Sequence, residues 1–82
     1  MKEATPRQLG QWHQWGHQQG FSHMVILHVE HPEGGLVCPY YCCDQDDVDY
    51  YSQQGVWKDR KVQGVYDLNR SLRTQQREER GE

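Results

Sequence analysis

The stretch Phe21–Cys43, FSHMVILHVEHPEGGLVCPYYCC, contains the densest apolar run of the chain and all three cysteines. Its first part, Phe21–Val29, is apolar and β-favouring on both alternating faces, which predicts a strand covered on both sides. Residues 31–35 contain the proline and two glycines of a reversal, and Leu36–Cys38 is expected to return as the partner strand. Pro39 should then end the pairing, because proline has no N–H to donate.

A helix should precede this hairpin. Thr5 and Gln8 form the pattern of a capping box around Pro6, and the helix should continue to about Gln18. At 100° per residue, its buried face should contain Leu9, Trp12, His13 and Gly16, with His17 at the margin.

Two helices should follow the hairpin. Asp44 can cap a short helix over about residues 45–54, and apolar residues at 65, 68 and 72 predict a last helix over about residues 65–76. Residues 56–65 are ambiguous, with a short edge strand as one alternative. The sequence therefore predicts a single small α+β domain over residues 1–82, with an ordered core at about 5–76.

The expected core is thin for a chain of 82 residues. Leu, Ile, Val and Phe make up about a sixth of the chain, below the roughly 20% at which a packed core becomes doubtful. Small domains of this kind usually need a disulfide, a metal or a partner. Three cysteines cannot all pair within one chain, and no apolar leader or membrane-length run is present. We therefore expect a cytoplasmic protein, in which clustered cysteines more often bind metal.

A zinc site is the main chemical hypothesis. Cys38 and Cys42 have the spacing of a zinc knuckle, and the i, i+4 spacing of His13 and His17 places two imidazoles about 6 Å apart on one helix face. These four residues are the predicted ligands of a structural zinc ion. The alternative ligands are Cys43, His28 and His31. The competing interpretation is that the cysteines are small buried hydrophobic residues and the histidines are ordinary polar residues.

No motif of a common enzyme class is present. The chain lacks a phosphate-binding glycine loop, a G-x-S-x-G turn and an HExxH helix. The aspartates of residues 44–49 do not form a calcium loop, because the required glycine is missing and Val48 occupies a ligand position. We expect a protein that is not an enzyme, although a Cys–His nucleophile pair stays open at this stage.

Two charged surfaces are candidates for partner binding. Asp44, Asp46, Asp47 and Asp49, with Tyr50 and Tyr51, suit a basic partner, although acidic residues also simply favour a helix start. On the predicted last helix, Tyr66, Arg70, Arg73 and Arg77 fall within an arc of about 60°, which suits phosphates and bases. The net charge of −3 and the pI near 5.9 argue against a dominant nucleic-acid surface.

The leading expectation is a small intracellular zinc-binding protein that acts by binding another protein, as an interaction module, inhibitor or regulator. One alternative is a nucleic-acid-binding regulator that uses the arginine-bearing helix. Another is an acidic mimic of nucleic acid that blocks a basic enzyme. The candidate contact residues are Trp15, Asp46, Asp47, Asp49, Tyr50, Tyr66, Arg70, Arg73 and Arg77.

Overall fold

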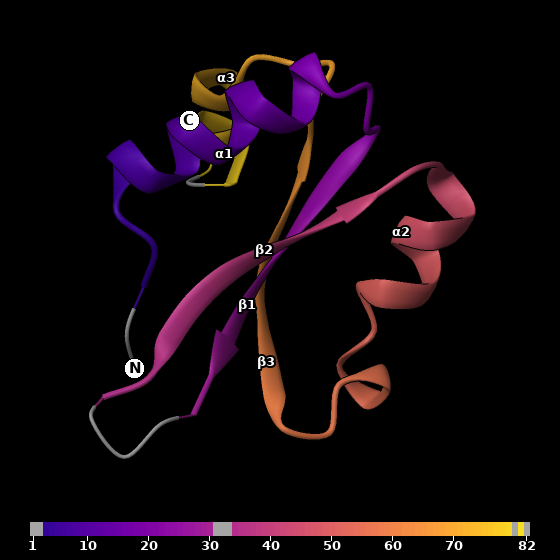
Figure 1. Cartoon of the computed structure of the whole chain (residues 1–82). Helices are drawn as coiled ribbons and strands as arrows, with labels where there is room; N and C mark the ends of the chain where they lie inside the picture. Colours follow the sequence, from indigo (N-terminus) through magenta and orange to yellow (C-terminus); the bar gives the residue numbers. More distant parts are fainter. Residues whose placement is uncertain (1–2, 31–33, 80, 82) are drawn as a thin grey trace.

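The computed structural model describes residues 3–30, 34–79 and 81 of the chain. Its elements, in chain order, are α1 (Pro6–Gln18), β1 (His23–Val29), β2 (Leu36–Cys42), α2 (Gln45–Tyr51), the 3-10 helix η1 (Gln54–Val56), β3 (Arg60–Asp67) and α3 (Leu72–Glu79) (Figure 1). The strands form an antiparallel sheet in the order β2-β1-β3. The chain is therefore the small α+β domain that the sequence predicts.

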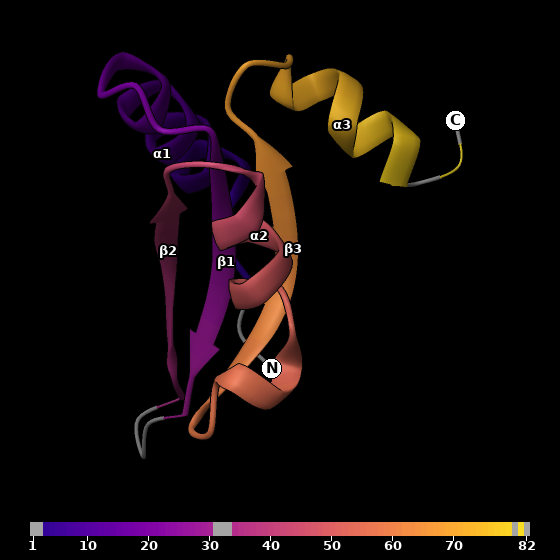
Figure 2. The ribbon, with the colours of Figure 1, turned by 90° about the vertical axis from the view of Figure 1, so that its right-hand side faces the viewer.

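The side chains of β1 alternate between two apolar clusters. Met24 and Ile26 pack in the cluster that contains Leu9 of α1, and Val25 and Leu27 pack in the cluster on the other face of the sheet. The second cluster includes Val48 of α2. Figure 2 shows α2 in front of the sheet and α1 behind it. This arrangement explains why the four consecutive residues Met24–Leu27 of β1 are all apolar.

The first helix confirms its sequence signals. Thr5 accepts a hydrogen bond from the Gln8 N–H, while the Gln8 side chain accepts one from the Thr5 N–H, and Pro6 starts the helix. The helix ends at Gln18, and Gly20 follows with a φ of 84°, a conformation that glycine adopts readily. Trp12 packs against the cluster that contains Leu9.

The second strand differs from the prediction. β2 runs through Pro39, which pairs with Ile26, and ends only at Cys42. Proline is tolerated in an edge strand, where alternate N–H groups point away from the sheet and have no partner to lose. The predicted cysteine-bearing turn is therefore wrong, because Cys38 and Cys42 both lie within a strand.

The last helix also differs from the prediction. Residues 60–67 form β3, so the apolar positions 65, 68 and 72 do not share one helix, and α3 begins at Leu72. Pairing with β1 over the whole length of β3 overrides the helical spacing. A bulge at Gln63 shifts the register between Ile26 and Leu27, which hides the strand periodicity in the sequence. The ambiguous segment is thus largely an edge strand.

The acidic helix α2 lies where it was predicted, and it is shorter. Asp44 caps it by accepting a hydrogen bond from the Asp47 N–H at 2.9 Å. The helix ends at Tyr51, and the 3-10 helix η1 begins three residues later, at Gln54. None of the described helices has the length and apolar character needed to cross a membrane.

Candidate functional site

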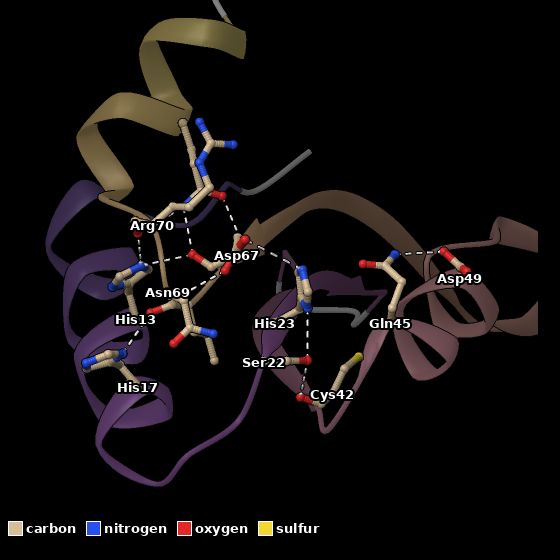
Figure 3. Close-up of polar contacts among 12 residues, drawn as sticks. His13, His17, Ser22, His23, Cys42, Gln45, Asp49, Asp67, Asn69 and Arg70 are labelled. Atoms are coloured by element: carbon tan, nitrogen blue, oxygen red, sulfur yellow. Dashed lines mark hydrogen bonds and ion pairs between the residues drawn. The ribbon is translucent and has the colours of Figure 1, made fainter.

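His13 and His17 hold α1 against the loop between β3 and α3. Nε2 of His13 lies 2.8 Å from the Arg70 carbonyl oxygen and 3.2 Å from that of Asp67. Nδ1 of His17 lies 2.9 Å from the Leu68 carbonyl oxygen. Figure 3 shows both imidazoles pointing from α1 toward this loop. Since a carbonyl oxygen only accepts hydrogen bonds, each of these ring nitrogens carries a proton and donates.

Cys38 and Cys42 lie on the opposite face of the sheet from α1. Both pack in the cluster that contains Val25, Leu27 and Val48. Four residues of extended strand separate their Cα atoms by about 13 Å, whereas two thiolates on one zinc ion lie about 4 Å apart. The cysteine half of the predicted site is therefore not formed in this conformation.

The four predicted ligands do not meet. Across the described residues, no group of three or more His, Cys, Asp or Glu side chains could hold a metal ion. The histidines contact loop carbonyls, and the cysteines contribute to a core cluster. Zinc binding itself stays a prediction that metal analysis must test.

The substitute ligands have separate locations. Cys43 is exposed. His28 is 2% exposed, and neither of its ring nitrogens has a hydrogen-bond partner among the residues that the structure describes. Its Nδ1 lies 3.7 Å from a carboxylate oxygen of Glu30. Its ring packs on Gly35, where a Cβ would collide with Nε2. His31 lies outside the described residues.

Cys42 is not an activated nucleophile. Burial raises the pKa of this thiol to about 11, and Asp47 adds to the effect. Nucleophilic cysteines need a lowered pKa, because the thiolate is the reactive form. The properties of Cys42 therefore do not support the alternative in which a Cys–His pair acts as a nucleophile.

Ser22, His23 and Asp67 form a polar seam at the end of the sheet (Figure 3). Ser22 Oγ lies 2.9 Å from His23 Nδ1, and His23 Nε2 lies 3.9 Å from an Asp67 carboxylate oxygen. These are the residue types of a hydrolase triad. However, the Ser22 hydroxyl donates to the Cys42 carbonyl oxygen at 3.2 Å. Its proton is therefore directed away from His23, and the arrangement ties β1 to the end of β2.

The acidic surface is built on α2. Asp44 caps the helix, and Asp47 accepts a hydrogen bond from the Cys43 N–H at 3.1 Å. Asp46 and Asp49 are exposed, and Asp49 accepts a hydrogen bond from the Gln45 side chain at 2.9 Å. Two of the four aspartates thus support the backbone, and the other two present carboxylates to solvent.

An aromatic cluster adjoins α2. Tyr40 lies 4.6 Å from Tyr51 and 5.4 Å from Trp57 between ring centroids, and Tyr50 packs edge-on against Tyr51 at 4.9 Å. A hydrogen bond with Tyr51 raises the pKa of Tyr40 to about 12. Tyr50 is 55% exposed, so the cluster extends from the core to the surface.

The predicted arginine face is wrong. Tyr66 lies in β3 and is buried in the core cluster that contains Leu9 of α1, called here the α1-side cluster. Arg70 lies in the loop before α3, and Arg73 and Arg77 lie on α3. Arg70 forms an ion pair with Glu78. The four residues therefore do not form one helical surface, because the segment that begins at Val65 is a strand.

Trp15 belongs to a second aromatic group, whose other members, Phe21 and Tyr41, pack against the core cluster that contains Leu9. It is 48% exposed and lies 4.9 Å from Tyr41 and 6.0 Å from Phe21 between ring centroids. The Tyr41 hydroxyl donates to the Trp12 carbonyl oxygen at 2.9 Å. These contacts give Trp15 a structural role, because its ring shields Phe21 and Tyr41 from solvent.

A hollow of about 380 Å³ lies between the start of the described chain, β3 and the end of α3. Its lining residues are Glu3, Ala4, Leu9, Ile26, Val62, Gln63, Gly64, Tyr66 and Glu79. Sequence reasoning did not identify this feature, since its residues come from four distant segments and only the fold brings them together.

Neither a protein-family model, nor a curated protein, nor a solved structure matches this chain.

Proposed function

We propose that the protein is a small non-enzymatic binding module, and that its helix α2 binds a basic surface of a partner protein. The observation that carries this proposal is the combination of outward carboxylates with a partly exposed aromatic cluster. Asp46 and Asp49 provide the carboxylates, and Tyr50 is the most exposed ring. No lysine or arginine lies on α2 itself.

The helix dipole does not account for all of this acidity. Acidic residues are favoured in the first turn of a helix, where Asp46 and Asp47 lie. Asp49 lies in the second half of the helix, where the dipole disfavours a carboxylate. The helix dipole therefore does not explain the carboxylate of Asp49, and its exposure supports a role in attracting cations.

The aromatic cluster adds specificity for arginine. The Arg60 guanidinium lies 5.5 Å from the centroid of the Trp57 ring, so the cluster already contacts one guanidinium of the chain itself. Arginine stacks on aromatic rings and pairs with carboxylates, and α2 offers both kinds of contact. The partner that best matches α2 is therefore a protein with an arginine-rich surface, such as one that normally binds nucleic acid. Occupying such a surface would make the protein an inhibitor or regulator of its partner.

The test is a titration of the isotope-labelled protein with an arginine-rich peptide, followed by amide chemical shifts. We expect shifts on α2 and η1, and binding that weakens with salt. Asp46→Asn with Asp49→Asn should weaken binding at least about fivefold, as expected when two charge contacts are lost. The matched control is Glu30→Gln with Glu78→Gln, which removes the same charge from exposed side chains outside α2. Equal weakening by both variants, or an absence of shifts on α2, would sink the proposal.

A further inference from the structure

The hollow beside β3 exists partly because Gly64, which lines it, has no side chain. Gly64 pairs with Ile26, so both residues belong to the face of the sheet that packs on Leu9. Glycine adds no side chain there, and a Cβ at this position would lie 3.2 Å from the Tyr66 ring. The hollow is thus bounded by a glycine and by the tyrosine two residues further along the same strand.

The floor of the hollow is apolar. Leu9 and Ile26 are 7% and 2% exposed, and Tyr66 is 8% exposed. All three line the hollow and belong to the α1-side core cluster. A ligand that enters it therefore meets the edge of a packed core, against which an alkyl chain can be buried.

Among the residues that the structure describes, the charged groups of the lining are both acidic. Glu3 lies at one side and Glu79, at the end of α3, lies at another. The Tyr66 hydroxyl donates to a carboxylate oxygen of Glu79 at 3.4 Å. Burial raises the pKa of Tyr66, with Glu79 adding to the effect, so the phenol keeps the proton that it donates. The Glu79 carboxylate is thereby held beside the apolar floor, and its remaining lone pairs are available to a cation.

We propose that this hollow is a binding site for a small organic cation: an alkyl chain that ends in a guanidinium or ammonium group. The alkyl part lies on Leu9, Ile26 and the Tyr66 ring, and the cationic end pairs with Glu3 and Glu79. A volume of about 380 Å³ accommodates a chain of this kind. The site is independent of α2, which covers the other face of the sheet.

The experiment titrates the isotope-labelled full chain with butylguanidinium and, separately, with butylurea. The two probes have nearly the same shape, and only the first carries a charge. We expect amide shifts at Gly64 and Tyr66 with butylguanidinium and much smaller shifts with butylurea. Weak binding is expected, because the hollow is open and the carboxylates are at its rim.

Glu3→Gln with Glu79→Gln should weaken butylguanidinium binding about tenfold, as the loss of two ion pairs predicts. Glu79→Gln alone is the second variant and should lose part of the affinity. Glu30→Gln with Asp59→Asn removes the same charge from residues outside both the hollow and α2, and it should leave the titration at Gly64 unchanged. The proposed function is read from shifts on α2 and this inference from shifts at Gly64, so failure of one is separable from failure of the other. Equal shifts with both probes, unchanged affinity in the Glu3 and Glu79 double variant, or no shifts at Gly64 would each overturn the proposal.

Discussion

The side-chain amide of Gln75 binds both backbone groups of Asp67 at the outer edge of β3. Its oxygen accepts from the Asp67 N–H at 2.6 Å, and its nitrogen donates to the Asp67 carbonyl oxygen at 2.7 Å. Gln54 acts in the same way at the other end of the strand, with its nitrogen 2.6 Å from the Arg60 carbonyl oxygen and its oxygen 2.9 Å from the Val62 N–H. Two glutamines thus cover an edge that would otherwise be open to pairing with another chain.

Replacing Gln75 with alanine should lower the free energy of unfolding by about 1 to 2 kcal/mol, because the Asp67 N–H loses its partner and the Asp67 carbonyl oxygen keeps only the His13 ring nitrogen. Urea unfolding measures the change. The control is Gln76→Ala, one residue further along α3, which should change stability by less than about 0.5 kcal/mol. Similar losses in both variants would show that the amide of Gln75 has no special role.

The two glycines of α1 should respond oppositely to alanine. A Cβ at Gly16 would lie 2.6 Å from the Tyr41 ring and 2.7 Å from a Leu68 methyl group, whereas a Cβ at Gly10 meets no atom within 4 Å. Gly16→Ala should therefore destabilise the protein by about 1 to 3 kcal/mol through overpacking. Gly10→Ala should stabilise it by roughly 0.5 to 1 kcal/mol through helix propensity. Thermal unfolding of the two variants checks the pair, and a stabilising Gly16→Ala would contradict the close packing of α1 on β2.

Local signals allowed α1, β1 and α2 to be predicted from the sequence. The capping box at Thr5, the apolar run of β1 and the cap at Asp44 each act over a few residues, and the structure contains all three. β3 was hidden because its partner, β1, lies more than 30 residues earlier and because the bulge at Gln63 breaks its periodicity. Pairing with β1, and not the local sequence, therefore makes residues 60–67 a strand.

The candidate site shows the same limit. The spacing of His13 and His17 correctly placed both on one side of α1, facing the rest of the fold. The spacing did not specify that the groups opposite them are the carbonyl oxygens of residues 67–70. The cysteine spacing was read as a turn, and in a strand the same spacing separates the thiols.

Stability should fall in alkaline solution. The ordinary pKa of Cys42 is 9.0, and in the folded chain burial raises it to about 11. Since the unfolded chain loses this proton first, the free energy of unfolding falls from about pH 9 and continues to fall through about pH 11, by about 2 to 3 kcal/mol in total from this group. Tyr40, with its pKa raised to about 12, acts in the same direction. Urea unfolding across this range should show a shallower decline for Cys42→Ala. Parallel profiles for the two proteins would show that the thiol ionises with equal ease in both states.

Removing metal should leave the fold intact. In the structure His13 and His17 donate to loop carbonyl oxygens, and Cys38 and Cys42 pack in the core cluster below α2. Each of the four side chains therefore has a contact that needs no zinc ion, and a strong chelator under reducing conditions should not change the melting temperature. His17→Ala should by contrast lower stability by about 1 kcal/mol, because the Leu68 carbonyl oxygen loses its donor, with or without chelator. Native mass spectrometry of protein purified without added metal gives the zinc content directly. One zinc ion per chain, together with a melting temperature that falls on chelation, would restore the four-ligand hypothesis and would require β2 to end before Cys42.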